Sequence, residues 1–271
     1  MPELPEVETT RRGIEPQLVG QTITGITIRK YQLRWPIAQT FKRALKGAYI
    51  TRVSRRAKYL LIDTTKATII IHLGMSGKLR IIDASSPVHA HDHVDWILNN
   101  KRVLRFTDPR RFGSIHYTQC NPLDHPLLRN LGPEPLARGF TGALLAQQAI
   151  GRRTAIKQFL MDSRQIAGLG NIYANEALFL AGIHPARKVN RLSIGRWERL
   201  AASIKYLLKQ AIKAGGSTLR DFTRADGQPG YFQMKFQVYG RAGKTCTRCH
   251  GKLRGIRQGQ RMTVYCPHCQ R

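Results

Sequence analysis

The sequence predicts an α+β protein with more than one domain: a β-rich first half, then a helical segment, then a small cysteine module. Three observations support this prediction. Short apolar runs separated by turn residues fill the region from about Thr22 to Tyr117, the apolar spacing beyond it becomes helical, and four of the five cysteines lie between residues 246 and 269. A chain of 271 residues has room for about one to three domains.

A helix followed by several short strands is predicted for the first half. Pro5 and Glu6 suit a first helical turn, and one helical face then carries Leu4, Val7, Ile14 and Leu18. The apolar runs that follow have strand length and are bounded by Gly, Asp, Asn and Pro, which is typical of a sandwich or a barrel. The predicted strands lie at Ile26–Ile28, Tyr59–Ile62, Thr68–Leu73, Leu79–Ile82, Val94–Leu98 and Val103–Phe106.

A linker and three helices are predicted for the second half. The segment Asn130–Gly142 contains two prolines and three glycines and is the predicted linker. Helical spacing then predicts helices at Ala155–Met161 and Asn171–Ala181, and the clearest apolar face runs from Ile194 to Ile212. The polar segment Thr218–Gln233 predicts a mobile loop.

The net charge of +29, from 45 basic against 16 acidic residues, indicates a polyphosphate partner. Such a charge is not expected of an enzyme that acts on small molecules and binds no polyanion. The longest apolar stretches, such as Ala67–Ile71, are too short to cross a bilayer, and the start Met-Pro-Glu-Leu-Pro-Glu lacks the features of a secretion signal. We therefore expect a cytoplasmic protein with a nucleic-acid partner and no membrane partner.

The cysteines predict one structural zinc ion. Each C-x-x-C pair can form a turn that aims two thiolates at one ion, and four thiolates leave no open coordination position. A disulfide pair and a redox C-x-x-C are the alternatives, and a reducing compartment disfavours the first. Basic residues between the two pairs indicate a finger laid on phosphate, or else a solvated basic face. The predicted ligands are Cys246, Cys249, Cys266 and Cys269.

The N-terminus contains a candidate nucleophile. Removal of Met1 would leave Pro2 as the terminal residue, with a secondary amine in place of an amide. Such an amine can attack an aldehyde-level carbon and form an iminium, while the adjacent Glu3 serves as acid or base. From the residues alone, an inert processed terminus with acids that complement a helix dipole remains the competing interpretation.

Loops at the predicted strand ends and one helix start hold candidate nucleic-acid contacts. Basic residues there can hold phosphates, and Met75, Arg110 and Phe112 can wedge into a base stack if their loops protrude. Asn171 begins a predicted helix, whose free N–H groups favour an anion, although a plain N-cap explains it equally well. Taken singly, each of the loop residues is also compatible with core packing or a solvated rim.

Five motifs and the four cysteines, in this order, resemble the bacterial formamidopyrimidine-DNA glycosylase family. The similarity runs from Pro2 to Cys269 and so covers essentially the whole chain. The motifs are PELPEVETTRRG at Pro2–Gly13, RAKYL at Arg56–Leu60, HLGMSG at His72–Gly77, DPRRFG at Asp108–Gly113 and GLGNIYA at Gly168–Ala174.

The resemblance implies a bifunctional glycosylase and AP lyase that excises oxidised purines from damaged double-stranded DNA. In the family these are chiefly 8-oxoguanine and formamidopyrimidines, and strand cleavage by β,δ-elimination follows. No redox cofactor or catalytic metal is needed. A nucleoid-associated monomer is expected, because the cleft between the domains must admit a duplex.

The resemblance also assigns catalytic roles. Pro2 matches the nucleophile that attacks C1′ of the damaged nucleotide, and Glu3 matches the acid/base partner of ring opening and base departure. Lys58 matches the lysine of β-elimination, and Arg261 matches the arginine of δ-elimination and phosphate binding.

The implied DNA contacts are carried over in the same way. His72 and Asn171 match phosphate contacts. Arg152 or Arg153 takes the place of a family lysine, and Thr218–Tyr231 matches the loop that covers the everted base. The side chains that fill the gap left by the flipped base match Met75, Arg110 and Phe112, and further DNA contacts match His91 and Arg110.

The implied domains are a catalytic β-sandwich with a leading helix at 1–130, the linker at 131–142, a helix–two-turn–helix domain at 143–235 and a zinc finger at 236–271. Two alternatives remain. The related endonuclease VIII type acts on oxidised pyrimidines and shares the terminal Pro-Glu, the lysine and the finger. A zinc-ribbon DNA- or RNA-binding protein without catalysis would explain the charge and the cysteines alone.

Overall fold

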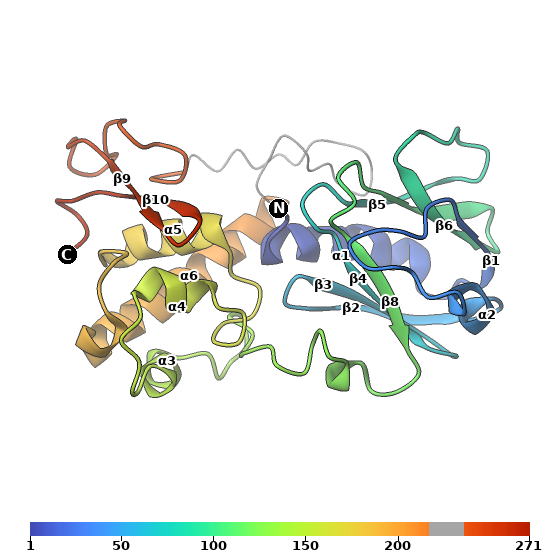
Figure 1. Ribbon diagram of the computed structural model, residues 1–271, viewed down its shortest axis with the longest axis horizontal. Helices are drawn as coiled ribbons and strands as arrows, with labels where there is room; N and C mark the ends of the chain where they lie inside the picture. The colour runs from blue at the N-terminus through green and yellow to red at the C-terminus, as the bar shows by residue number, and fades with distance from the viewer. Residues whose placement is uncertain (217–235) are drawn as a thin grey trace. The chain divides into compact units, whose positions relative to one another are not determined.

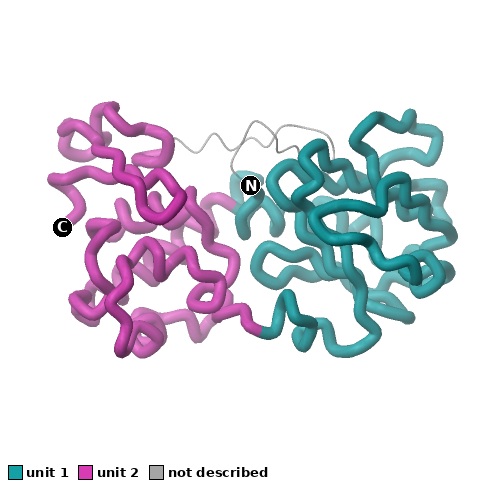
Figure 2. Tube along the Cα trace, viewed as in Figure 1, with its two compact units in different colours: residues 1–129, 212–233 teal, residues 130–211, 234–271 magenta. Residues whose placement is uncertain are grey.

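The computed structural model describes residues 1–216 and 236–271 (Figure 1). The chain divides into two compact units, which Figure 2 colours separately. Unit 1 comprises Met1–Arg129 and Ile212–Gln233, and unit 2 comprises Asn130–Ala211 and Met234–Arg271. The loop predicted at Thr218–Gln233 lies outside the described residues. The predicted division into segments 1–130, 131–142, 143–235 and 236–271 stays a prediction.

Unit 1 is a two-sheet β-sandwich with a leading helix, as predicted. Helix α1 (Leu4–Leu18) begins with Pro5 in its first turn, where a missing N–H costs nothing. One antiparallel sheet has the order β1 (Ile23–Ile28), β6 (Asp92–Leu98), β7 (Arg102–Thr107) and β5 (Lys78–Asp83). The other has the order β2 (Ile50–Arg56), β3 (Tyr59–Thr64), β4 (Thr68–His72) and β8 (Ser114–Thr118).

The core of unit 1 lies between the two sheets and under α1. Val7 and Ile14 of α1 pack in one cluster with Trp96 and Phe106 of the first sheet and with residues of the second sheet such as Ile69. These side chains are almost fully buried, so the apolar period along α1 and along the strands is explained by one shared core. The sandwich thereby fixes the loops at the strand ends, where the candidate site residues lie.

Unit 2 combines helices with a β-hairpin. Its helices are α3 (Gly142–Gln148), α4 (Ile156–Met161), α5 (Asn171–Ala181) and α6 (Ile194–Lys213), and its hairpin is β9 (Arg254–Gln258) with β10 (Arg261–Tyr265). The described residues also form two 3₁₀ turns (η), η1 (Pro122–Asp124) and η2 (Val189–Arg191). Across residues 1–216 and 236–271, no helix combines the length and the apolar composition that crossing a membrane requires.

Two short helices are not predicted from the sequence: α2 (Phe41–Leu45) in unit 1 and α3 in unit 2. They have five and seven residues, too few to show a helical repeat. Thr141 caps α3 by accepting a hydrogen bond from the Leu144 N–H at 3.1 Å. The predicted linker therefore ends directly at a helix.

Candidate functional site

The first residues of the chain are buried in unit 1. Pro2 is buried and Glu3 is 3% exposed, directly before α1. The carboxylate of Glu6 accepts a hydrogen bond from the Glu3 N–H at 2.8 Å, which fixes the entry into the helix. Gly216, at a φ of +86°, lies against Glu6, because an added Cβ would come within 3.3 Å of the Glu6 Cγ. Pro2 and Glu3 are therefore held in a defined position.

An ion pair ties α1 to the hairpin that carries Lys58. Arg55 of β2 lies 3.2 Å from the Glu8 carboxylate, and both side chains are about nine-tenths buried. The hairpin turn between β2 and β3 consists of Ala57 and Lys58, and Arg55 donates to the Ala57 carbonyl at 2.7 Å. Ala57 adopts a φ of +54°, a conformation that is costly for a residue with a Cβ. The hairpin thus presents half-buried Lys58 at its tip.

His72 is placed beside this hairpin as a neutral hydrogen-bond donor. It pairs with Tyr59 across β3 and β4, and the two ring centroids lie 4.9 Å apart. Burial, together with the charges of Lys58 and Arg34, lowers the pKa of His72 from 6.5 to about 4. Because its Nδ1 accepts from the Gly74 N–H at 3.0 Å, the proton resides on Nε2. That N–H suits a phosphate oxygen.

Asp108 fastens together the two loops that carry the predicted gap-filling residues. It is fully buried and accepts from the Ser76 hydroxyl at 2.6 Å and from the Gly113 N–H at 2.8 Å. Ser76 in turn accepts from the Arg110 N–H at 3.2 Å. The loops also touch through their backbones, since a Cβ on Gly74 would lie 2.3 Å from the Phe112 carbonyl carbon. Both loops therefore form one rigid element.

This element exposes the side chains that the sequence predicts as wedges. Phe112 is 45% exposed, and the exposed Arg110 guanidinium lies over its ring at 4.8 Å. Met75 is half-buried at the tip of the other loop. An exposed aromatic ring capped by a cation is well suited to contact a base.

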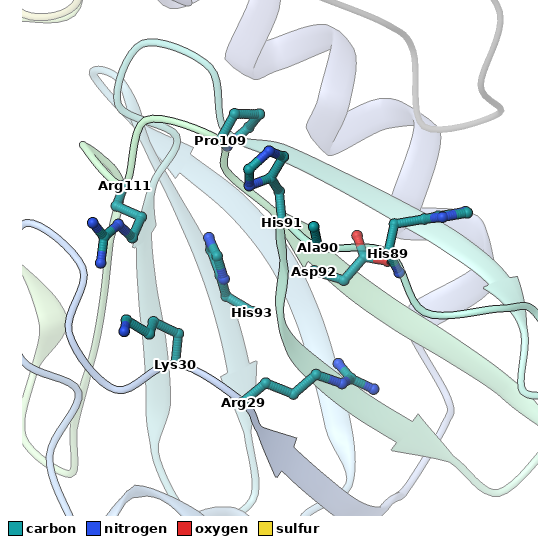
Figure 3. A pocket seen from close by; sticks show the side chains of 9 residues that line it. All are labelled: Arg29, Lys30, His89, Ala90, His91, Asp92, His93, Pro109 and Arg111. Atoms are coloured by element: carbon teal, nitrogen blue, oxygen red, sulfur yellow. The ribbon is translucent and has the colours of Figure 1, made fainter.

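His91 lines a basic pocket of about 460 Å³ in unit 1 (Figure 3). The pocket draws side chains from three segments, namely Arg29 and Lys30 after β1, the residues 89–93 before and within β6, and Pro109 and Arg111 after β7. Buried Asp92 fixes this arrangement, because its carboxylate accepts from the His89 N–H at 2.8 Å and pairs with Arg105 at 3.3 Å. His91 therefore lies next to the loop of Arg110.

In unit 2 the structure brings Asn171 and the hairpin of Arg261 together. Asn171 is the first residue of α5, and its side-chain amide donates to the carbonyl of Met262 at 3.3 Å. Buried Lys157 of α4 holds the same strand, donating to the Met262 carbonyl at 3.1 Å and to the Thr263 hydroxyl at 2.7 Å. Arg261 is exposed beside these contacts. A helix start and an exposed arginine thus lie on one edge of unit 2, an arrangement that suits an anion.

Arg152 and Arg153 are both exposed, after α3. Arg152 donates to the Gln148 carbonyl at 2.9 Å, which leaves the rest of its guanidinium available. The structure does not choose between them as the predicted DNA contact.

The four cysteines form one cluster in unit 2. Their Sγ atoms all lie within 4.8 Å of one another, with Cys246 and Cys269 at 3.9 Å and Cys249 and Cys266 at 3.4 Å. Four thiolates at about 2.3 Å from a tetrahedral ion would be about 3.8 Å apart, so the donor set fits such an ion. The cluster is therefore a structural metal site.

Several positioning residues were not singled out from the sequence. Asp108 and Ser76 lie inside the quoted motifs, Arg55 directly precedes one of them, and Glu8 lies among the N-terminal acids, but none of the four is assigned a role from the sequence. Their signal was weak because an acid in a basic segment indicates only an ion pair. Lys157 is a lysine inside an apolar helix, which is unusual enough to have been noticed.

The chain matches three family models in succession. They are described as the formamidopyrimidine-DNA glycosylase N-terminal domain, over residues 1–115, the formamidopyrimidine-DNA glycosylase H2TH domain, over 131–223, and the zinc finger found in FPG and IleRS, over 243–271. The second and third matches agree with the predicted helix–two-turn–helix and finger.

Full-length relatives and solved structures agree with these models. The formamidopyrimidine-DNA glycosylases of Alcanivorax borkumensis and Nitrosococcus oceani are 53% and 54% identical, with all of both chains covered. The complex of Lactococcus lactis Fpg with DNA containing an abasic site has a TM-score of 0.91 at 36% identity, covering 99% of each chain. The Thermus thermophilus MutM (Fpg) protein has a TM-score of 0.88 at 36% identity, covering 99% of this chain and 98% of that one. The protein therefore belongs to the family of bacterial formamidopyrimidine-DNA glycosylases.

Proposed function

We propose that this protein is a bifunctional DNA glycosylase and AP lyase that removes 8-oxoguanine and formamidopyrimidines from duplex DNA and then cleaves the strand by β,δ-elimination. Membership of the family supports the glycosylase activity. Structural relatives bound to abasic-site DNA and to Fapy-dG DNA support a damaged duplex as the substrate. The observation that carries the proposal is the buried Pro2-Glu3 start, tied through Glu8 and Arg55 to the hairpin of Lys58.

Base removal begins with the amine of Pro2. Once Met1 is removed, the nitrogen lone pair attacks C1′, the bond from C1′ to the base breaks, and the base leaves with a proton. The nitrogen gives up its own proton, its lone pair opens the ring C1′–O4′ bond, O4′ takes a proton, and the nitrogen and C1′ form an iminium. Glu3, held at the start of α1, is the group that supplies and accepts these protons.

Strand cleavage uses the iminium as an electron sink. It acidifies the C2′ proton, so a base removes that proton and the C3′–O bond breaks, releasing the 3′ phosphate. A second elimination removes the C4′ proton and breaks the C5′–O bond, releasing the 5′ phosphate, and water then hydrolyses the iminium and frees Pro2. Lys58 at the hairpin tip serves the first elimination, and Arg261 serves the second, each also meeting phosphate.

The remaining site residues bind the duplex. His72 and Asn171 donate to phosphate oxygens, and His91 and Arg152 or Arg153 add contacts. Because a base inside a duplex is unreachable, the enzyme must evert it and fill the gap. The wedge side chains on the two fastened loops are the exposed Arg110 and Phe112 and the half-buried Met75.

We propose Zn²⁺ as the ion of the cysteine cluster, since four thiolates suit it. The ion would be structural: it would hold the turns that flank β9 and β10, and so the strand that begins at Arg261. We further propose that a monomer acts on the nucleoid in the bacterial cytoplasm. Sedimentation of the 30.7 kDa chain would reveal a dimer if this part is wrong.

Borohydride trapping tests the chemistry. We would offer one duplex with 8-oxoguanine opposite cytosine and one with an oxidised thymine, after confirming by mass that Met1 is absent. A covalent adduct with the first and little with the second supports an imine-forming purine glycosylase. The reverse preference would move the protein to the endonuclease VIII type. No adduct with either duplex would leave a DNA-binding protein without catalysis.

A matched pair of samples tests the nucleophile. Pro2→Gly retains a terminal amine, so it should alter lyase products while DNA affinity stays nearly intact. A chain whose terminal amine has been acetylated should form no adduct but still bind DNA. Equal loss of adduct and affinity in Pro2→Gly would argue against the assignment of Pro2.

A further inference from the structure

A cluster of cations in unit 2 has no role in the proposed chemistry. Between His184 and Arg199 the chain has five basic residues and one acid, Glu198. We call the five the 187–199 basic patch: Arg187, Lys188, Arg191, Arg196 and Arg199. Three of them, together with His184, line a hollow of about 370 Å³.

Among the described residues, no Asp or Glu side chain forms an ion pair with the basic patch. The carboxylate of Glu198 is used elsewhere, accepting from the N–H groups of Gly142 and Ala143 at the start of α3. Arg196 donates to the main-chain oxygen of Arg271 at 2.7 Å. Lys188, Arg191 and Arg199 are exposed.

The cations are close enough to repel one another. Partial burial and the charges of Arg187 and Arg199 lower the pKa of Arg196. Burial and the charge of Arg187 likewise lower the pKa of His184, whose ring lies 4.4 Å from that of Tyr265. A fold that holds like charges together without acids gains stability when an anion binds among them.

The basic patch is continuous with other predicted DNA contacts. Its segment follows the end of α5 and is held to the hairpin of Arg261, because the side chain of Gln258, which pairs with Arg261, donates to the Pro185 carbonyl at 3.2 Å. The patch segment pairs with the stretch after Arg153, since the Val189 N–H donates to the Thr154 carbonyl at 3.1 Å and the Ile156 N–H to the Arg187 carbonyl at 2.8 Å. It therefore extends the surface of Arg152 and Arg153.

We propose that the 187–199 basic patch binds the sugar-phosphate backbone of duplex DNA beyond the base pairs around the lesion, and so lengthens the DNA contact of the enzyme. Continuity with Arg152 and Arg153 and the arginine-rich composition favour DNA over other polyanions. The inference rests on the proposed function, because it takes the bound duplex as the anion.

The test compares two triple variants of equal charge. The patch variant carries Arg187→Gln, Lys188→Gln and Arg191→Gln. The control carries Lys42→Gln, Arg43→Gln and Lys46→Gln, three exposed cations at and after α2 in unit 1. Affinity for an undamaged duplex of about 30 base pairs is measured by fluorescence anisotropy between about 50 and about 200 mM salt. Metal content and thermal melting check that both variants fold. If the patch variant does not fold, the single variant Lys188→Gln takes its place in the affinity measurement.

Each lost phosphate contact lowers the slope of log affinity against log salt by about 0.9. We expect the magnitude of this slope to decrease by about 2 to 3 in the patch variant, by about 0.9 in Lys188→Gln, and by less than about 1 in the control. An unchanged slope in the patch variant, or an equal decrease in both triples, would overturn the proposal. The proposal would also be overturned if the patch variant kept the native slope on DNA but lost binding to phosphatidylglycerol vesicles, since that result would assign the patch to a lipid surface.

A second measurement locates the contact. Duplexes with an uncleavable abasic-site analogue carry a flank of about four or about 15 base pairs, on either side in turn. The native protein should bind the duplex with the long flank more tightly than the duplex with the short flank when the flank lies on one side of the lesion, and the patch variant should show no such difference. The absence of any flank effect in the native protein would refute the placement. The salt slope on undamaged DNA requires no catalysis. Failure of the catalytic proposal in the borohydride test can therefore be distinguished from failure of the patch proposal in the slope measurement.

Discussion

Replacing Asp108 by alanine is expected to release the loops that hold Met75, Arg110 and Phe112. The carboxylate is fully buried and accepts from Ser76 at 2.6 Å and from the Gly113 N–H at 2.8 Å. Hydrogen bonds to a charged group contribute about 1.5 to 3 kcal/mol each, and relief of burying the carboxylate offsets part of the loss. We expect about 3 kcal/mol of local destabilisation.

Asp108→Asn should cost less, about 1 to 1.5 kcal/mol, because its carbonyl can still accept from Gly113. Hydrogen exchange measured by mass spectrometry over residues 108–113 reports the local opening. A loss of about 3 kcal/mol corresponds to exchange faster by a factor of about 10². Asp83→Ala in the same unit is the control, since the Asp83 side chain is 72% exposed.

The effect of the substitution on DNA binding should depend on the order of the two loops. Asp108→Ala should lose affinity for a lesion duplex while binding undamaged DNA nearly as before, because the wedge side chains act only at an everted base. Two results would refute the reasoning: unchanged exchange in the alanine variant, or an asparagine variant as damaging as alanine.

Three further predictions concern protonation and the metal. Burial alone would raise the pKa of Glu8, but hydrogen bonds from Arg11 and Arg12 and the charges of Arg11 and Arg55 hold it below 4.5. The ionised group therefore stabilises unit 1 above about pH 4.5 and less so as pH falls through its lower folded-state pKa, so Glu8→Gln should lower the urea midpoint at pH 7 and match the native protein in stronger acid. The pKa of His72 is lowered from 6.5 to about 4, so between those values the unfolded chain binds a proton that the folded chain does not, and the free energy of unfolding decreases by up to about 1.4 kcal/mol for each unit by which the pH is lowered. In a pH series of urea titrations, His72→Gln should lose this dependence. An unaltered dependence would contradict the burial argument. Chelation of the metal, or Cys249→Ser, should expose the β9–β10 hairpin to hydrogen exchange, whereas Cys120→Ser, at an exposed thiol, should not; metal analysis alongside would detect a false positive.

Strong local signals made much of the fold predictable. Helix α5 begins and ends at the predicted residues, because Gly170 precedes it and Gly182 ends it at a positive φ of 68°. The long apolar face of α6 and the two C-x-x-C pairs were equally readable, since each feature lies within one stretch of sequence. Most predicted strands match within one or two residues, because their turns are marked by Gly, Asp and Asn.

The parts that sequence could not supply depend on contacts between distant segments. Nothing near Ser76 indicates that its hydroxyl reaches Asp108, 32 positions away. Similarly, nothing near Lys157 indicates that its ammonium reaches Thr263, 106 positions away. The strained φ of Ala57 is also invisible in its residue type, because alanine gives no turn signal. Such features require the tertiary structure.

The metal cluster shares its packing with the helices of unit 2. Cys246 and Cys266 are buried in one apolar cluster with Phe179 of α5 and Val264 of β10, and Glu176 of α5 accepts from three successive N–H groups at 237–239. In this chain the finger therefore depends on contacts outside residues 243–271. Engineering that moved residues 243–271 alone onto another chain would leave Phe179 and Glu176 behind and would have to supply an apolar surface and an acceptor in their place.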